Sequence, residues 1–259
     1  MKKKIFFAFF LIFTILIYIT SDKYSVGSDI SYFTAPSCPP SAGQLKIGMI
    51  GDSWVKRGDM EKPLEEQLLQ YGVKADVIES GHSGATSKMI YENLFADKNE
   101  SIYSSKFVVE FCPQYCIVVA GVNDSFRGFG KTYYAEYVVK IANTLLHYNI
   151  TPVILEIPNY SVEESQNTRS KLGVYRDALW FSLKGEDYKN LDAYRDELKK
   201  YLKKEGLENR VILINPNDAN IDYQKHPEWY EDPLHLNDKG YKELVNVIAK
   251  KMHENIDTK

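Results

Sequence analysis

Five residues with the chemistry of an acyl-transfer site are spread over this chain in four short clusters. Ser53 offers a nucleophile, His235 a general base and Asp232 a carboxylate that can orient the base. Gly84 and Asn123 add amide donors of the kind that stabilise a developing oxyanion. The four clusters are Gly51-Asp52-Ser53, Gly81-His82-Ser83-Gly84, Gly121-Val122-Asn123-Asp124 and Asp232-Pro233-Leu234-His235.

Strands must bring these clusters together, and the sequence predicts a strand before each of the first three clusters. Each of the first three clusters follows an apolar run typical of a buried β-strand, at residues 45–50, 75–79 and 117–120. Segments that leave the carboxyl ends of parallel strands meet in one crevice of an open α/β sheet. The pattern therefore predicts that Ser53, Gly84 and Asn123 become neighbours.

Helices alternate with the strands along the rest of the chain. Further strands are predicted at residues 152–157 and 211–214. Helical spacing is found at residues 60–71, 87–95, 133–148, 192–205 and 239–252. Residues 107–111 fit a helix or a strand. This alternation predicts an α/β fold with a parallel sheet covered on both faces.

The four clusters stand in the order and roughly the spacing of the SGNH hydrolases, also called the GDSL esterase family, and the resemblance runs from about residue 46 to about residue 241. It implies a three-layer α/β/α fold with a five-stranded parallel sheet of the flavodoxin-like SGNH type. By this resemblance Ser53 would be the nucleophile, His235 its base and Asp232 the partner of the base. The amides of Ser53 and Gly84 and the side chain of Asn123 would form the oxyanion hole.

One departure from the family is Trp54, which stands where the family name has Leu; we expect it to pack behind the nucleophile. Outside the resemblance, Ser53 also fits an ordinary helix cap. His82 lies beside the predicted oxyanion segment and can line the substrate pocket, and His226 is a reserve candidate for the base. An α/β-hydrolase elbow, G-x-S-x-G, is excluded because Val55 occupies its last position.

Composition limits the classes of protein that fit. The chain has 259 residues, 44% of them apolar and 26% charged, which suits one catalytic domain over residues 45–259. The net charge is -3 and the basic residues are scattered, which disfavours nucleic acid as a partner. We expect no cofactor and no metal, because no set of Cys and His completes a zinc site.

The amino terminus predicts export. Lys2, Lys3 and Lys4 precede the apolar stretch 5–20, so residues 1–21 fit a signal peptide or an N-terminal membrane anchor, and residues 22–44 fit a linker. The expected location is extracytoplasmic: secreted, periplasmic or attached to the membrane through residues 5–20.

The three cysteines, Cys38, Cys112 and Cys116, fit one structural disulfide or buried thiols. Their spacing does not reveal which of them pair.

The substrate is the least determined feature. The long connection 159–191 carries several aromatic residues, including Trp180, and Trp229 lies shortly before Asp232. Such rings suit stacking on sugars, or simple core and lid packing. We expect an exported serine esterase that removes small acyl groups, above all acetyl, from carbohydrate. The alternatives are a lipase or lysophospholipase, a glycan O-acetyltransferase, and a catalytically silent glycan-binding envelope protein.

Overall fold

The computed structural model describes residues 32–38, 43–99, 101–184 and 189–256. Contacts divide the chain into two units, Met1–Phe33 and Thr34–Lys259. The predicted signal or anchor at residues 1–21 lies outside the described residues, and so does most of the first unit. Within the predicted linker, residues 32–38 form neither helix nor strand. None of the helices in the described ranges is both long and apolar enough to span a membrane.

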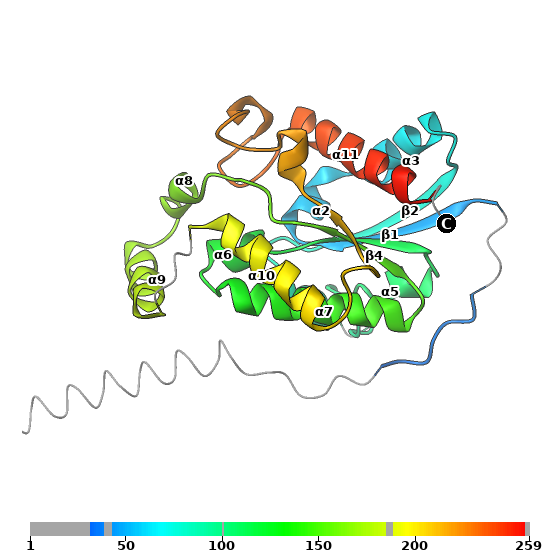
Figure 1. Ribbon diagram of the computed structural model, residues 1–259, viewed down its shortest axis with the longest axis horizontal. Helices are drawn as coiled ribbons and strands as arrows, with labels where there is room; N and C mark the ends of the chain where they lie inside the picture. The colour runs from blue at the N-terminus through cyan, green and yellow to red at the C-terminus, as the bar shows by residue number, and fades with distance from the viewer. Residues whose placement is uncertain (1–31, 39–42, 100, 185–188, 257–259) are drawn as a thin grey trace, which may run out of the picture. The chain divides into compact units, whose positions relative to one another are not determined.

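A five-stranded parallel sheet forms the centre of the second unit, in the order β2-β1-β3-β4-β5, which confirms the predicted α/β fold (Figure 1). The strands are β1 (Leu45–Gly51), β2 (Ala75–Gly81), β3 (Tyr115–Val119), β4 (Thr151–Leu155) and β5 (Ile212–Ile214). All five residues of β3 are buried. A continuous apolar run is what a central strand with both faces covered requires.

The register of the sheet makes the first three strand ends level. Gly51, the last residue of β1, pairs with Gly81 of β2 on one side and with Val119 of β3 on the other. The three chain segments that follow these residues therefore begin side by side. This is the physical basis of the predicted convergence of the first three clusters.

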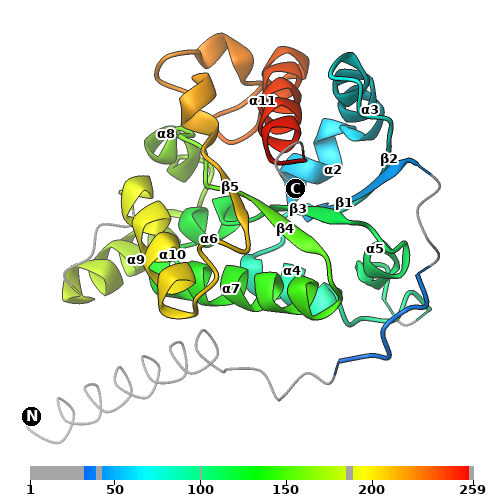
Figure 2. The ribbon, with the colours of Figure 1, turned by 45° about the vertical axis from the view of Figure 1, so that its right-hand side comes forward.

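Helices cover both faces of the sheet (Figures 1 and 2). On one face α3 (Glu61–Gln70) and α11 (Asp238–Ile256) pack against each other. On the other face lie α4 (Ser87–Asn93), α5 (Lys106–Glu110) and α7 (Lys131–His147), with α10 (Leu191–Lys204) packed on α7. The ambiguous residues 107–111 thus fall mostly in a helix.

Four helices and two 3-10 turns in the described residues have no counterpart among the elements expected from the sequence. They are α2 (Ser53–Gly58), α6 (Val122–Phe126), α8 (Val162–Gln166), α9 (Lys171–Lys184), η1 (Pro216–Ala219) and η2 (Pro227–Trp229). Most of these have six residues or fewer, too short for an amphipathic period to become visible. The predicted long connection 159–191 contains α8 and α9, so it is largely helical.

Helix α2 lies unusually close to the end of β2. A β-carbon at Gly81 would lie only 2.2 Å from the backbone nitrogen of Lys56 in α2. Glycine at this position therefore allows the helix that begins at Ser53 to pack against the neighbouring strand end.

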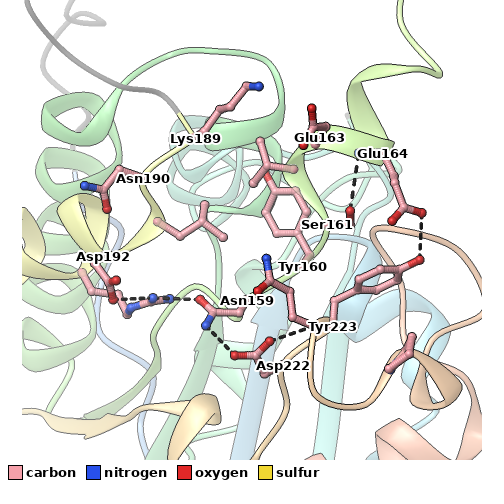
Figure 3. Close-up of a pocket in the computed structure, with 15 residues that line it drawn as sticks. Asn159, Tyr160, Ser161, Glu163, Glu164, Lys189, Asn190, Asp192, Asp222 and Tyr223 are labelled. Atoms are coloured by element: carbon pink, nitrogen blue, oxygen red, sulfur yellow. Dashed lines mark hydrogen bonds and ion pairs between the residues drawn. The ribbon is translucent and has the colours of Figure 1, made fainter.

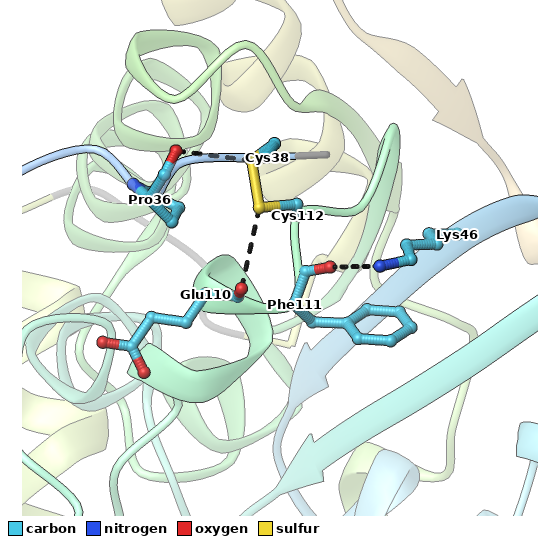
Figure 4. The surroundings of a disulfide bond; sticks show 6 residues. All are labelled: Pro36, Cys38, Lys46, Glu110, Phe111 and Cys112. Carbon is cyan, nitrogen blue, oxygen red and sulfur yellow. Dashed lines mark hydrogen bonds between the residues drawn. A yellow bond between two sulfur atoms is a disulfide. The ribbon is translucent and has the colours of Figure 1, made fainter. Parts of the chain in front are cut away.

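A disulfide joins Cys38 to Cys112, with an S–S distance of 2.07 Å and a sequence separation of 74 (Figure 4). Cys116 is a buried free thiol. The structure thereby resolves the pairing that the spacing left open. Closing a loop of this length is worth about 4 kcal/mol in the chain-entropy model, so the bond holds the segment before β1 onto the loop after α5.

Candidate active site

The hydroxyl of Ser53 lies at the point where β1 ends and α2 begins. Asp52 caps α2 by accepting a hydrogen bond from the backbone N–H of Trp54 at 2.9 Å. Ser53 is thus the first helical residue, and its amide belongs to those that find no acceptor inside the helix. Its Oγ lies 3.0 Å from Nε2 of His235, although 182 residues separate the two in the sequence.

The other ring nitrogen of His235 faces Asp232. Nδ1 of His235 lies 2.8 Å from Oδ2 and 2.9 Å from Oδ1 of the carboxylate. Burial raises the pKa of Asp232, but hydrogen bonds from the His235 ring and from the amides of Leu234 and His235 outweigh it and hold the pKa below its ordinary value. The carboxylate is therefore ionised near neutral pH and can fix the proton on Nδ1, which leaves Nε2 free to accept one from Ser53.

A hairpin-like turn carries this histidine. Tyr230 and Leu236 form an antiparallel bridge, and the amide of Glu231 donates to the carbonyl of His235 at 2.9 Å. We call residues 229–237 the histidine turn. These bonds close the turn on itself, with Asp232 and His235 on the same side.

Trp54 links the nucleophile to the histidine turn. Its side chain is fully buried, as expected for a position behind the nucleophile, and Nε1 donates to the carbonyl oxygen of Leu234 at 2.9 Å. The ring also meets Tyr241 of α11 edge-on at 6.4 Å. A leucine would fill part of this space, but it could not donate the hydrogen bond.

Arg57 lies beside Asp232, and this contact was not expected from the sequence. It forms an ion pair with Glu231, and Nη1 lies 3.7 Å from Oδ2 of Asp232. The available signal was its spacing: four residues after Ser53, it lies on the same face of α2. The three side chains are close to half exposed, so water screens their attraction.

The predicted oxyanion donors, Gly84 and Asn123, follow the two strands that flank β1 in the sheet. Gly84 has a φ of +78°, a conformation that favours glycine. The side-chain amide of Asn123, in α6, donates to the carbonyl of Ala85 at 3.1 Å and to Oδ2 of Asp52 at 3.4 Å. The structure therefore brings Asn123 between the residues adjoining Gly84 and those adjoining Ser53. A substrate oxygen would share or replace the longer bond, the one to Asp52.

Two buried carboxyl groups adjoin Asn123: Asp52, which accepts its hydrogen bond, and Asp124, which follows it in the sequence. Neither had an expected role. Asp52 and Asp124 are both fully buried. Desolvation raises the pKa of Asp52 to about 7, with a further contribution from the charge of Asp124. Desolvation likewise raises the pKa of Asp124 to about 6, although the amide and hydroxyl of Ser87 both donate to it.

The residues predicted to bind substrate are placed less centrally. The His82 ring bonds to Ser80 at 3.1 Å and meets Tyr103 edge-on, and burial and Lys56 lower its pKa. Trp229 belongs to η2 and lies in the histidine turn. The Trp180 side chain lies outside the described part of the structure.

The reserve base, His226, does not lie against Ser53. Its ring stacks on Trp229 at 4.1 Å between centroids, and Nδ1 contacts Glu228 at 3.0 Å. The Ser53 hydroxyl contacts His235 instead.

Three side chains of the histidine turn are also close enough to share a cation: Glu231, Asp232 and His235, whose ligand atoms all lie within 4.8 Å of one another. Their atoms are already engaged with partners. Asp232 and His235 bond to each other, and Glu231 pairs with Arg57. The contact between Asp232 and His235 has the geometry of a proton relay.

A polar cavity of about 860 Å³ adjoins the histidine turn (Figure 3). Ser161 on its wall donates its amide to the carbonyl of Pro233 at 3.0 Å. Asn159 bonds to Asp222 at 2.8 Å within the wall, and Tyr223 bonds to Glu164 at 2.9 Å. A cavity rich in hydrogen-bonding groups therefore lies against the turn that carries His235.

Comparisons with known proteins identify a family and a shared fold. The model of the GDSL-like Lipase/Acylhydrolase family matches residues 49–243. No curated protein gives a significant match.

Similar solved structures include a GDSL-like lipase from Bacteroides thetaiotaomicron VPI-5482, with 15% identity, a TM-score of 0.53, and 82% of this chain and 88% of that one covered. The acetyl xylan esterase AlAXEase has 17% identity and a TM-score of 0.54, covering 82% and 100%. A catalytic mutant of an acetylxylan esterase from Geobacillus stearothermophilus has 14% identity and a TM-score of 0.55, covering 81% and 95%. At these identities the likeness shows a shared fold.

Proposed function

This chain belongs to the GDSL-like lipase/acylhydrolase family and is an ester hydrolase, and on that premise we propose that it is an exported serine esterase that removes small acyl groups, above all acetyl, from carbohydrate. The observation that carries the proposal is the continuous relay from Oγ of Ser53 to Nε2 of His235 at 3.0 Å and from Nδ1 to Asp232 at 2.8 Å. Such a relay is the equipment of nucleophilic acyl transfer.

In the proposed mechanism, Oγ of Ser53 attacks the ester carbonyl while Nε2 of His235 takes the hydroxyl proton. The amides of Ser53 and Gly84 and the side chain of Asn123 donate to the oxyanion. When the tetrahedral intermediate collapses, the protonated His235 gives its proton to the leaving alcohol. His235 then removes a proton from water, which attacks the acyl-serine and releases the acid.

Carbohydrate is favoured by the walls of the cavity beside the histidine turn. They offer amide, carboxylate and phenol groups, such as those of Asn159, Asp222 and Tyr223, which suit sugar hydroxyls (Figure 3). Two structural neighbours are named as acetyl xylan esterases, which supports the same substrate class.

Export is favoured by two independent features. The lysines and apolar stretch at the amino terminus resemble a secretory signal. The disulfide between Cys38 and Cys112 suits an oxidising compartment. We expect the chain to fractionate with the cell envelope or the medium; recovery of a reduced protein from the cytoplasm of the native cell would contradict this part of the proposal.

A lipid esterase is the second candidate, because α9 exposes an apolar stripe. Leu172, Tyr175 and Leu179 are 82%, 74% and 61% exposed and follow helical spacing. An exposed stripe of this kind suits contact with acyl chains or a lipid surface.

A panel of p-nitrophenyl esters from acetate to palmitate separates the two candidates. We expect the full chain to prefer acetate, and Ser53→Ala to lose at least about 10³-fold in kcat. A preference for palmitate would favour the lipid esterase. The matched control is Ser101→Ala, whose hydroxyl bonds locally to the amide of Tyr103. Equal rates for the parent and Ser53→Ala would defeat the catalytic assignment, and release of acetate from acetylated xylan would identify carbohydrate as the substrate.

A further inference from the structure

The guanidinium of Arg127 lies directly over the predicted oxyanion segment. A β-carbon at Gly84 would lie 2.8 Å from Nη2 and 4.0 Å from Cζ of Arg127. The arginine caps α6, and its amide donates to the carbonyl of Asn123 at 3.0 Å. Gly84 thus leaves the space that the guanidinium needs.

This position is close to the reacting centre. Asn123 reaches Ala85 on one side and Asp52 on the other, and Ser53 directly follows Asp52. Arg127 therefore lies one helical turn from a predicted oxyanion donor and in contact with the segment that carries another. A group held by its guanidinium would therefore lie beside the segment that carries the Gly84 amide.

The guanidinium of Arg127 has hydrogen-bond donors that a ligand could use. Arg127 is exposed, and within the described ranges its guanidinium has no hydrogen-bond acceptor and no ion pair. Asp124 interacts electrostatically with Arg127, but its carboxyl group is fully buried and already accepts hydrogen bonds from Ser87. By contrast, Arg57 pairs with Glu231 and Arg195 with Asp192.

We propose that Arg127 binds an anionic group, a carboxylate or a phosphate, on the alcohol part of the ester, so that the substrate is an acylated acidic carbohydrate. The inference rests on the proposed function, because a small acyl group leaves only the alcohol part to carry the charge. A guanidinium fork matches either oxyanion with two parallel hydrogen bonds. The walls of the cavity beside the histidine turn carry more acidic than basic side chains: Glu163, Glu164, Asp192 and Asp222 against Lys189 and Arg195. The exposed guanidinium of Arg127 therefore suits an anionic group better than this cavity does.

The test compares phenyl acetates that differ in the group opposite the ester: 4-acetoxybenzoate, its neutral methyl ester, and 4-acetoxyphenyl phosphate. For each anionic ester, kcat/KM is divided by that of the neutral ester. We expect Arg127→Gln to lower this ratio by about 10-fold, the usual size for one charge-assisted hydrogen bond at an accessible site, and Arg127→Lys to restore part of it. The anionic ester with the larger fall identifies carboxylate or phosphate as the natural group.

Arg210→Gln is the matched control. Arg210 is also exposed, but it precedes the amino end of the edge strand β5, whereas Arg127 follows the carboxyl end of the central strand β3, so removal of Arg210 should leave the ratio unchanged. Rising salt should lower the ratio in the parent, because an exposed cation is screened.

Two results overturn the inference alone. Both leave the ratio unchanged in Arg127→Gln. Either the rates for all three esters stay as in the parent, or they fall equally for charged and neutral esters, which would indicate a purely structural arginine. If the parent hydrolyses none of the three esters faster than Ser53→Ala does, the proposed function fails, and the inference fails with it.

Discussion

The two halves of the candidate active site are built in opposite ways. The half that holds Ser53 and Asn123 rises from level strand ends, and its polar groups are almost completely buried. The half that holds His235 is a turn between η2 and α11, in which the side chain of Asp232 is 42% exposed. One half is fixed by the sheet, whereas the other is fixed by a few individual hydrogen bonds.

Their carboxyl groups show what this difference means chemically. Desolvation raises the pKa of Asp52 to about 7, whereas hydrogen bonds hold the pKa of Asp232 below its ordinary value. Burial thus favours the neutral form in the half that supports the nucleophile. Exposure and donated hydrogen bonds favour the charged form in the half that moves protons. Opposite shifts of this kind indicate different tasks for two carboxyl groups of one site.

The largest effect should come from removing the charge in the histidine turn. We expect Asp232→Asn to lower kcat by about 10⁴-fold, because an amide does not hold His235 in the tautomer that accepts the Ser53 proton. Hydrolysis of p-nitrophenyl acetate measures it, with the exposed Asp196→Asn of α10 as the control. A loss below 10-fold would mean that the half-exposed carboxylate does not orient the base.

A smaller loss is expected in the buried half. Asn123→Ala removes a donor to the oxyanion, and we expect kcat to fall by about 100-fold or more while KM changes little. A change confined to KM would assign Asn123 to substrate binding instead. Thermal unfolding of the variant separates this effect from the loss of the bonds to Ala85 and Asp52.

Substitutions of Trp54, which links the two halves, should have smaller effects than those of Asp232 and Asn123. Trp54→Phe and Trp54→Leu both remove the hydrogen bond to the carbonyl of Leu234, and we expect each to lower kcat/KM by about 10-fold through a less well-positioned His235. Trp54→Leu should also lower the free energy of unfolding by about 2 to 3 kcal/mol because it leaves a cavity. If Trp54→Phe matched the parent in activity, the hydrogen bond would have no role in positioning.

The smallest effect concerns stability alone. A carboxyl group whose pKa rises on folding stabilises the fold below its unfolded pKa of 3.8, and this contribution is lost as the pH rises through about 7. Asp52→Asn should therefore flatten the fall in unfolding free energy between pH 4 and pH 7. Urea unfolding at pH 4 and pH 7 measures this. An unchanged slope would show that Asp52 is not the group that titrates.

For Asp232 the same reasoning has the opposite sign. Its pKa falls on folding, so its contribution to stability is present above the unfolded pKa of 3.8 and is lost as the pH falls through the lower folded value. The acid side of the stability profile therefore contains the contribution of Asp232 in the histidine turn, and the fall in stability toward neutral pH contains that of Asp52 in the buried half.

The sequence predicted the central residues of this site better than the residues around them. Apolar runs with glycine-rich ends were sufficient to expect that Ser53, Gly84 and Asn123 converge. Arg57 and Arg127 were missed, because α2 and α6 are too short to be expected from an amphipathic period, and the spacing from Ser53 to Arg57 has a meaning only once a helix is known there. The pairing of Cys38 with Cys112 was also beyond the sequence, since spacing along the chain does not fix distance in the fold.

Sequence by itself determined which residue types follow each strand, and therefore the class of chemistry, because local patterns of apolar and turn residues reflect backbone preferences. Only the tertiary structure decided that Gly51, Gly81 and Val119 end level, that His235 meets Ser53 across 182 residues, and that Asp52 is buried while Asp232 is not. Register, long-range contact and desolvation all depend on how distant segments pack, and no local pattern carries that information.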